Sequence, residues 1–207
     1  MSEHPSLRMP ADRRARLFAV ATEEFATFGF SQASLNRIIG KVGMSKSSFY
    51  HYFGNKTDLF KQTLDQALAP LTTAREAFDL EFLSAETFWP IMRQMMREMT
   101  EMLNQSPEMV MVGRMFYRSY DNPDEQEMTR DVMNQASDWL GDLMARGQDL
   151  GRLRKDLPQE FLIEMLMALG MAMDRWILGH WEDLSDGERL ELNDQGFDLF
   201  LRMLEPR

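Results

Sequence analysis

Apolar residues recur at spacings of three and four along most of this chain, and alternation with a period of two is absent. The first such run consists of Leu17, Ala21, Phe25 and Phe28. Spacings of three and four put side chains on one face of an α-helix, whereas a half-buried strand needs alternation. The sequence therefore predicts an all-α fold.

Glycine, proline and asparagine mark where the predicted helices end. The first run closes at Gly29, and a second, shorter run closes at Gly43. These breaks give about nine helices, the first three short and closely spaced, at about 11–28, 35–42, 45–53, 56–70, 84–104, 107–120, 124–149, 158–182 and 187–204. Residues 1–10 hold two prolines and little apolar material, which predicts a loose arm.

Charge is divided unevenly along the chain. Residues 1–60 hold eight Lys or Arg against five Asp or Glu, a balance of +3, and the remainder holds 15 against 28, a balance of −13, which together give the net charge of −10. A DNA duplex is a dense polyanion, so an evenly acidic surface would oppose DNA binding. The basic first segment is compatible with a nucleic-acid contact, and chance clustering of surface charge is the alternative.

Composition narrows the class of protein further. The 207 residues include no cysteine and only three scattered histidines, His4, His51 and His180. The chain has no glycine-rich phosphate loop and no metal-ligand cluster, so the sequence predicts no enzyme, no cofactor and no metal site. It also lacks a signal-peptide run and any stretch of about 18 uncharged apolar residues. We therefore expect a soluble, cytoplasmic protein without membrane contact.

The stretch SKSSFYHYFGNK, residues 45–56, concentrates aromatic rings between basic residues. At 100° per residue, one helix face consists of Phe49, Tyr52 and Phe53. The other face consists of Lys46, Ser47, Tyr50 and His51. The first set can pack in a core, while the second offers polar groups to DNA phosphates or base edges. Taken singly, a surface histidine and a half-buried tyrosine are equally good interpretations of His51 and Tyr50.

Two short helices joined by a tight turn have the spacing of a helix-turn-helix, whose second helix enters the major groove of DNA. Here the turn falls between Val42 and Ser45. Lys56, in the first turn of the next helix, lies beside free backbone N–H groups that favour an anion such as phosphate. The predicted DNA-binding residues are Ser34, Lys46, Ser47, Ser48, Tyr50, His51 and Lys56.

The segment SLNRIIGKVGMSKSSFYHYFGNKTDLF resembles the DNA-binding region of the TetR family of transcriptional regulators. Ser34 stands where the family usually has threonine, and Met44 replaces a valine. The positions in register with the family pattern are Ile38, Gly43, Ser45, Tyr50, Phe53 and Lys56. Ile39 and Val42 replace alanines, which predicts a slightly wider separation of the two short helices, and Gly40 costs about 1 kcal/mol relative to alanine. The resemblance covers about residues 11–60.

The resemblance implies a helix-turn-helix DNA-binding domain over residues 11–70 and a helical effector-binding and dimerisation domain over residues 71–207. It also implies a homodimer through the helices at about 158–182 and 187–204, which carry apolar residues around much of their circumference. Such a dimer would hold two recognition helices about 34 Å apart on double-stranded DNA. The implied function is a repressor released from a two-fold-symmetric operator by a small-molecule effector. The alternative is a helical protein–protein interaction module.

The body after residue 60 holds 16 of the 19 methionines and all four tryptophans. Methionine suits an adaptable apolar cavity, although ordinary core packing is the alternative. The candidate effector-lining residues are Trp89, Met92, Met96, Met99, Phe116, Tyr117, Trp139, Met165 and Trp176. Arg114 and Arg118, one turn apart, either hold an anionic ligand group or form ordinary ion pairs. His180 is expected to be a helix-end histidine rather than a metal ligand.

Overall fold

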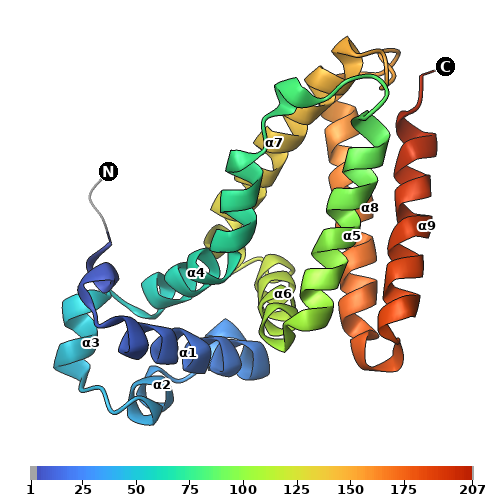
Figure 1. The fold of residues 1–207 in the computed structure, drawn as a ribbon. Helices are drawn as coiled ribbons and strands as arrows, with labels where there is room; N and C mark the ends of the chain where they lie inside the picture. Colours follow the sequence, from blue (N-terminus) through green and yellow to red (C-terminus); the bar gives the residue numbers. More distant parts are fainter. Residues whose placement is uncertain (1–3, 207) are drawn as a thin grey trace. The chain divides into compact units, whose positions relative to one another are not determined.

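The computed structural model describes residues 4–206, except for the side chain of Glu76, and within them the chain forms nine α-helices and no strand (Figure 1). The predicted all-α fold is confirmed. The helices are α1 (Ala11–Gln32), α2 (Leu35–Lys41), α3 (Lys46–Tyr52), α4 (Lys56–Ala77), α5 (Phe88–Gln105), α6 (Pro107–Tyr120), α7 (Arg130–Asp149), α8 (Gln159–Gly179) and α9 (Asp186–Leu204). Four short 3-10 helices accompany them: η1 (Pro5–Arg8), η2 (Leu80–Phe82), η3 (Gln126–Met128) and η4 (Trp181–Asp183).

No helix in the described part of the chain is both long and apolar enough to cross a bilayer.

The described chain divides into two compact units. The first comprises residues up to 74 together with Glu108–Asp131, and the second comprises Arg75–Pro107 together with residues from Val132 onward. Helix α6 therefore groups with the N-terminal helices. The predicted functional division at residue 70 stays a prediction. The structural division differs from it because the chain returns to the first unit after α5.

Phenylalanine rings fill the core of the first unit. The rings of Phe25 in α1 and Phe60 in α4 meet edge to face with centroids 5.0 Å apart, and the rings of Phe49 and Phe53 stack at 5.3 Å. All four side chains are buried. Burying one phenylalanine side chain contributes about 1.5–3 kcal/mol. This core therefore stabilises α3, whose seven residues are too few for a stable isolated helix.

Gly29 lies inside α1 rather than at its end. Its φ of 72° is a left-handed conformation that glycine adopts readily, and the helix then resumes and ends at Gln32. A Cβ at this position would lie 2.7 Å from Nε of Arg118 in α6. The predicted helix end near Phe28 is therefore wrong by about one turn, because the glycine supports a kink and a close contact with α6.

Two other predicted helix limits are wrong. Helix α4 continues through Pro70 to Ala77, although proline removes one backbone donor from the helix. The last turn of α4 is anchored instead, since the Arg75 guanidinium donates to the backbone carbonyl and the side chain of Gln135 in α7. Helix α7 begins at Arg130 and not near residue 124, because the preceding residues form turns and η3.

The prediction of a loose N-terminal arm is wrong for residues 5–8, which form η1 and pack against α1 and α3. Ser6 and Met9 are buried, so this segment belongs to the first unit rather than to the solvent. Residues 1–3, the first part of the predicted arm, lie outside the described residues.

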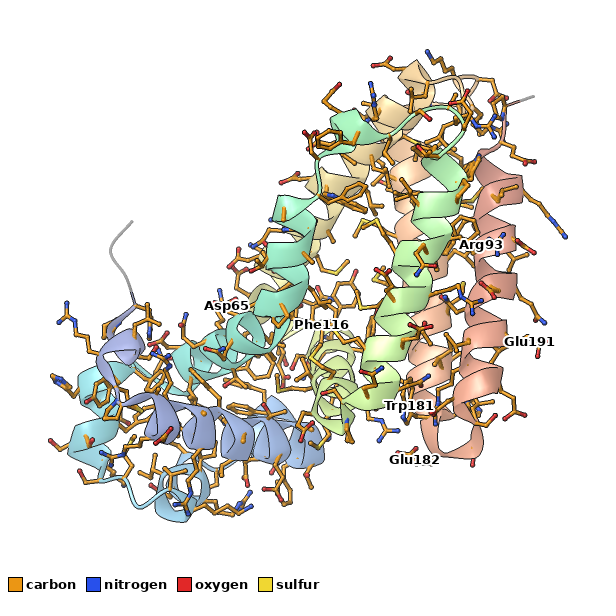
Figure 2. The ribbon with its side chains drawn as sticks, viewed as in Figure 1. Asp65, Arg93, Phe116, Trp181, Glu182 and Glu191 are labelled. Carbon is orange, nitrogen blue, oxygen red and sulfur yellow. The ribbon has the colours of Figure 1, made fainter. Side chains whose placement is uncertain are left out.

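In the second unit, α9 packs against both α5 and α8. Phe88 of α5 and Phe197 of α9 belong to its buried apolar cluster. Arg93 on α5, labelled in Figure 2, pairs with Asp194 and Asp198 on α9, and its guanidinium lies 4.4 Å from the centroid of the Phe197 ring. These contacts fix the register of α5 against α9.

Candidate nucleic-acid interface

Helix α3 has the two faces that its sequence predicts. Phe49 and Phe53 are 0% and 1% exposed and lie in the core, whereas Tyr50 is 59% exposed. Lys46, Ser47 and His51 are also exposed, and Ser48 and Tyr52 are half-buried. The inward rings thus hold the helix in place while one phenol, one imidazole, one ammonium and the serine hydroxyls face outward.

Serine caps start both short helices. The Ser34 hydroxyl accepts from the backbone N–H of Arg37 at 3.4 Å, and the Ser45 hydroxyl accepts from the N–H of Ser48 at 3.1 Å. Such caps satisfy N–H groups that lack a partner within the helix and stabilise it by about 1 kcal/mol. Between the helices, Gly43 takes a φ of 63°, which permits the tight turn. The local sequence therefore sets the angle at which α3 leaves α2.

A buried carboxylate fixes the start of α2. The Glu24 side chain in α1 is 2% exposed, and its Oε1 accepts from the Ser34 N–H and from Nε of Arg37, both at 2.8 Å. Burial acts to raise the pKa of the Glu24 carboxyl, but the hydrogen bonds from Arg37 and Ser34 and the charges of Arg37 and Lys41 outweigh it and lower the pKa below its ordinary value. Glu24 therefore stays ionised and ties α2 to α1.

The Lys56 side chain points to the end of α1. Its Nζ donates to the carbonyls of Phe30, Ser31 and Ala33 at 2.7, 3.3 and 3.1 Å and lies 4.5 Å from the centroid of the Phe30 ring. Desolvation by burial lowers the pKa of this amine, while the charges of Glu125 and Glu24 act in the opposite direction. The predicted phosphate contact of Lys56 stays untested, and the structure gives its ammonium a different set of partners.

The outward face of α3 has the chemistry that DNA recognition needs. Hydroxyl, phenol and imidazole groups can donate to or accept from base edges, and an ammonium pairs with a phosphate. The Tyr50 ring packs edge to face on buried Phe49 with centroids 5.2 Å apart, and the His51 ring packs on Tyr52 at 4.8 Å. These contacts limit the rotation of both exposed rings. Ser34 is half-buried and its oxygen caps α2, which leaves its O–H free to donate.

The candidate effector-lining residues are divided between the two units, and their role stays a prediction. Phe116, labelled in Figure 2, and Tyr117 belong to the first unit, and the others belong to the second. Met92 is buried in the core of the second unit, and Trp89 and Met96 are partly buried and pack against this core. Trp139 is half-buried with an unpaired indole N–H. The exposed candidates are Met99, Met165 and Trp176.

The other charged candidates have structural partners. The Arg118 guanidinium donates to the Thr27 carbonyl at 3.3 Å, and Arg114 also interacts within the protein. His180 ends α8 as predicted, and its ring stacks on Trp176 with centroids 4.3 Å apart. No group of three His, Asp or Glu side chains in residues 4–206 is placed to hold a metal ion.

Sequence reasoning missed two carboxylates that hold the interface in place. Glu24 lies three residues after Ala21 on the apolar stripe of α1, and an acid on such a stripe is a readable signal. Glu125 has no comparable signal. It is buried in the turn after α6, where it accepts from the hydroxyls of Ser31 at 2.6 Å and Ser119 at 2.9 Å.

Residues 17–63 match the sequence model of the bacterial regulatory proteins of the tetR family. Over 64 residues the chain is 36% identical to the HTH-type transcriptional repressor SCO4008 of Streptomyces coelicolor, and this match spans 31% of the chain and 33% of that repressor. Over 159 residues it is 24% identical to the HTH-type transcriptional regulator YdgC of Bacillus subtilis, which spans 76% of the chain and 77% of YdgC. The chain thus matches about a third of the length of SCO4008 and most of YdgC.

A solved structure shares the fold over nearly the whole chain. The transcriptional regulator FadR from Bacillus subtilis, in complex with stearoyl-CoA, aligns with a TM-score of 0.73 and 14% identity over 90% of this chain and 97% of FadR. The matched segment, from Leu17 to Thr63, contains both serine caps, the Gly43 turn and the outward face of α3. Residues 17–63 therefore match the N-terminal region of the tetR family of bacterial regulatory proteins, and the chain as a whole shares the fold of FadR.

Proposed function

We propose that this protein is a sequence-specific, DNA-binding transcriptional regulator in which α3 enters the major groove. The division of α3 into two faces carries this proposal. Phe49 and Phe53 are held in the core, and Tyr50, His51 and Lys46 stand outside on a helix that is capped at its start. A rigidly held helix presents donors and acceptors to base edges at a defined register.

A homodimer through α8 and α9 is the assembly that suits this function. The exposed face of α8 is apolar over several turns and consists of Phe161, Met165, Ala168, Ala172 and Trp176. Leu199 on α9 is also 49% exposed. Such a face is covered when a second copy packs against it, and two-fold symmetry then predicts an operator with two related half-sites.

Repression relieved by a small molecule is the mode of action that we propose. SCO4008 is named a repressor, and the FadR structure contains stearoyl-CoA. An effector bound in the second unit would act by binding the DNA-free state more tightly than the DNA-bound state. A coupling of about 1–3 kcal/mol between effector and DNA would lower operator affinity about 5- to 150-fold.

Selection of bound duplexes from a randomised DNA pool at near-physiological salt tests the function. We expect recovered sites with two-fold symmetry and half-sites about one helical turn apart. Replacing both Tyr50→Ala and His51→Ala should abolish the sequence preference without changing the thermal midpoint, because both side chains are exposed. Phe82→Ala, which removes another exposed aromatic ring outside the first unit, is the matched control and should leave the preference intact.

Recovery of no preferred sequence from folded, dimeric protein would reject the proposal. In that case Tyr50 and His51 become candidates for a protein contact, and the interaction-module alternative gains weight. A large fall in thermal midpoint for the Tyr50→Ala and His51→Ala variant would show instead that these rings support the fold.

A further inference from the structure

Most basic side chains in residues 4–74 have partners inside the protein. Arg37 and Lys41 pair with Glu24 and Glu23, and Lys56 donates to backbone carbonyls. The remaining internal contacts are those of Arg14 with the Leu7 carbonyl, Arg16 with the Lys41 carbonyl and Lys61 with Asp131. Within residues 4–206, Arg8, Arg13 and Lys46 make no such polar contact.

Two of these three cations lie outside the site described above. Lys46 is on α3, whereas Arg8 ends η1 and Arg13 is in the first turn of α1. Both precede residue 17, where the match to the family begins. Residues 4–16 hold four arginines against one acid, the exposed Asp12. This end of the first unit therefore carries excess positive charge that the rest of the protein does not neutralise.

The short helix η1 is held in place at both of its ends. Nδ1 of His4 accepts from the Ser6 N–H at 3.1 Å, and Nε2 lies 3.1 Å from a carboxylate oxygen of Asp58 in α4. The His4 ring also lies 5.7 Å from the ring of Phe53. At the other end, Met9 is 3% exposed. A segment anchored in this way keeps Arg8, which is exposed, in a defined place.

The position of η1 beside α3 determines what Arg8 can reach. Helix α3 packs against α2 and against η1, and Figure 1 shows η1 beside α3 and the start of α1. Packed helices lie about 8–10 Å apart from axis to axis. The major groove is about 12 Å wide. An element packed beside a helix in the groove therefore lies over the groove wall, which is the sugar–phosphate backbone.

We propose that η1 and the first turn of α1 form a second DNA-contacting element, in which Arg8 and Arg13 bind backbone phosphates beside the groove that α3 enters. A planar guanidinium binds a phosphate through two parallel hydrogen bonds. Such contacts raise affinity for all sequences and fix the orientation of α3, but they do not read bases. The inference rests on the proposed DNA-binding function and adds a contact that the helix-turn-helix does not contain.

The test measures binding of the full chain to its selected duplex and to a mixed-sequence duplex at several salt concentrations. The variant is Arg8→Gln with Arg13→Gln. The matched control is Arg16→Gln with Lys61→Gln, which removes the same charge from two side chains that have partners inside the protein. Each lost phosphate contact makes the slope of log affinity against log salt shallower by about 0.9. We therefore expect a slope shallower by about 1.8 per bound protomer on both duplexes, with unchanged sequence preference.

Anchoring by His4 is tested in the same assay. His4→Ala should weaken binding to both duplexes in the wild-type background and have no further effect in the Arg8→Gln, Arg13→Gln background. An equal loss in both backgrounds would show that His4 acts through the fold and not through the arginines, which would overturn the anchoring role.

The outcomes separate this inference from the proposed function. An unchanged slope in the Arg8→Gln, Arg13→Gln variant, or an equal change in the control, would overturn the second element while specific binding through α3 stands. A wild-type protein that prefers no sequence would overturn the proposed function, and one that binds no duplex at all would overturn the inference as well.

Discussion

The partners of Lys56 differ from those that its position in the sequence suggests. A lysine in the first turn of a helix is well placed for a phosphate. The last carbonyls of a helix, however, lack partners within that helix, and an ammonium group supplies three donors. In this fold the end of α1 meets the start of α4, so Nζ of Lys56 reaches the carbonyls of Phe30, Ser31 and Ala33. Sequence spacing locates the helix start, but it does not reveal this contact between distant segments.

Replacing Lys56 by methionine should therefore lower stability rather than weaken DNA binding alone. Lys56→Met keeps an apolar stem of similar length and leaves carbonyls at the end of α1 without their donor. We expect a loss of about 1–3 kcal/mol in the free energy of unfolding, measured by urea denaturation. Lys46→Met is the matched control, because the Lys46 side chain is exposed and makes no polar contact within the described residues, and it should leave stability unchanged.

The opposite result would support a phosphate contact by Lys56. Unchanged unfolding of Lys56→Met, together with a salt slope of DNA binding shallower by about one unit, would show that the ammonium leaves the α1 carbonyls to bind phosphate.

Glu24 provides a prediction that depends on pH. Its carboxyl has a pKa lowered from the ordinary value of 4.5 in the folded protein, so ionised Glu24 contributes stability above that pH. The contribution is lost as the pH falls through the folded-state pKa. Glu24→Gln keeps the shape but loses the charge, and we expect it to cost about 1.5–3 kcal/mol near neutral pH. The difference from wild type in the free energy of unfolding should shrink below about pH 4.5.

Glu23→Gln is the control for this prediction. Glu23 is adjacent in sequence, but its side chain is 57% exposed and its ion pair with Lys41 is on the surface, so the change should have little effect. Equal losses for Glu23→Gln and Glu24→Gln across the whole pH range would contradict the role given to the buried carboxylate.

Among the elements, α3 could be read almost completely from the sequence. Its buried and exposed residues follow the helical period, and a serine, a common N-cap residue, stands directly before its first residue, as it does before α2. The limits of α1, α4 and α7 could not be read in this way. Gly29 and Pro70 usually end a helix, yet here contacts with Arg118 and at Arg75 support the chain beyond them. Local sequence patterns predict where a helix begins, but contacts between distant segments decide where it ends.

The short helix η1 also could not be predicted from local sequence patterns. Two prolines and few apolar residues predict a loose arm, and no local pattern reveals that His4 contacts Asp58 and Phe53. The faces of α3 were predictable because they depend on spacing within a single helix. The second DNA-contacting element was not predictable, because it depends on which segment packs beside that helix.

At the scale of the whole molecule, the distribution of charge makes DNA binding depend on the pairing of two chains. The residues after 60 carry a balance of −13, which repels a duplex, so DNA affinity must come from the small basic segment. Two such segments on one duplex bind more tightly than one, because the second binds at a high effective concentration once the first is bound. Loss of the proposed dimer should therefore reduce operator binding without any change at α3.

The exposed face of α8 allows this dependence to be tested. Met165 and Trp176 are 45% and 49% exposed, so Met165→Glu with Trp176→Glu should leave the chain folded and place charges where a partner helix would pack. We expect light scattering to show a monomer in place of a dimer, and binding to the selected duplex to fall at least tenfold. Phe82→Glu, at an 82% exposed side chain in η2, introduces the same charge outside this face and should leave the dimer intact. A dimer that survives the double change would exclude this face of α8 as the interface, and operator binding would then have to depend on a different pairing of the chains.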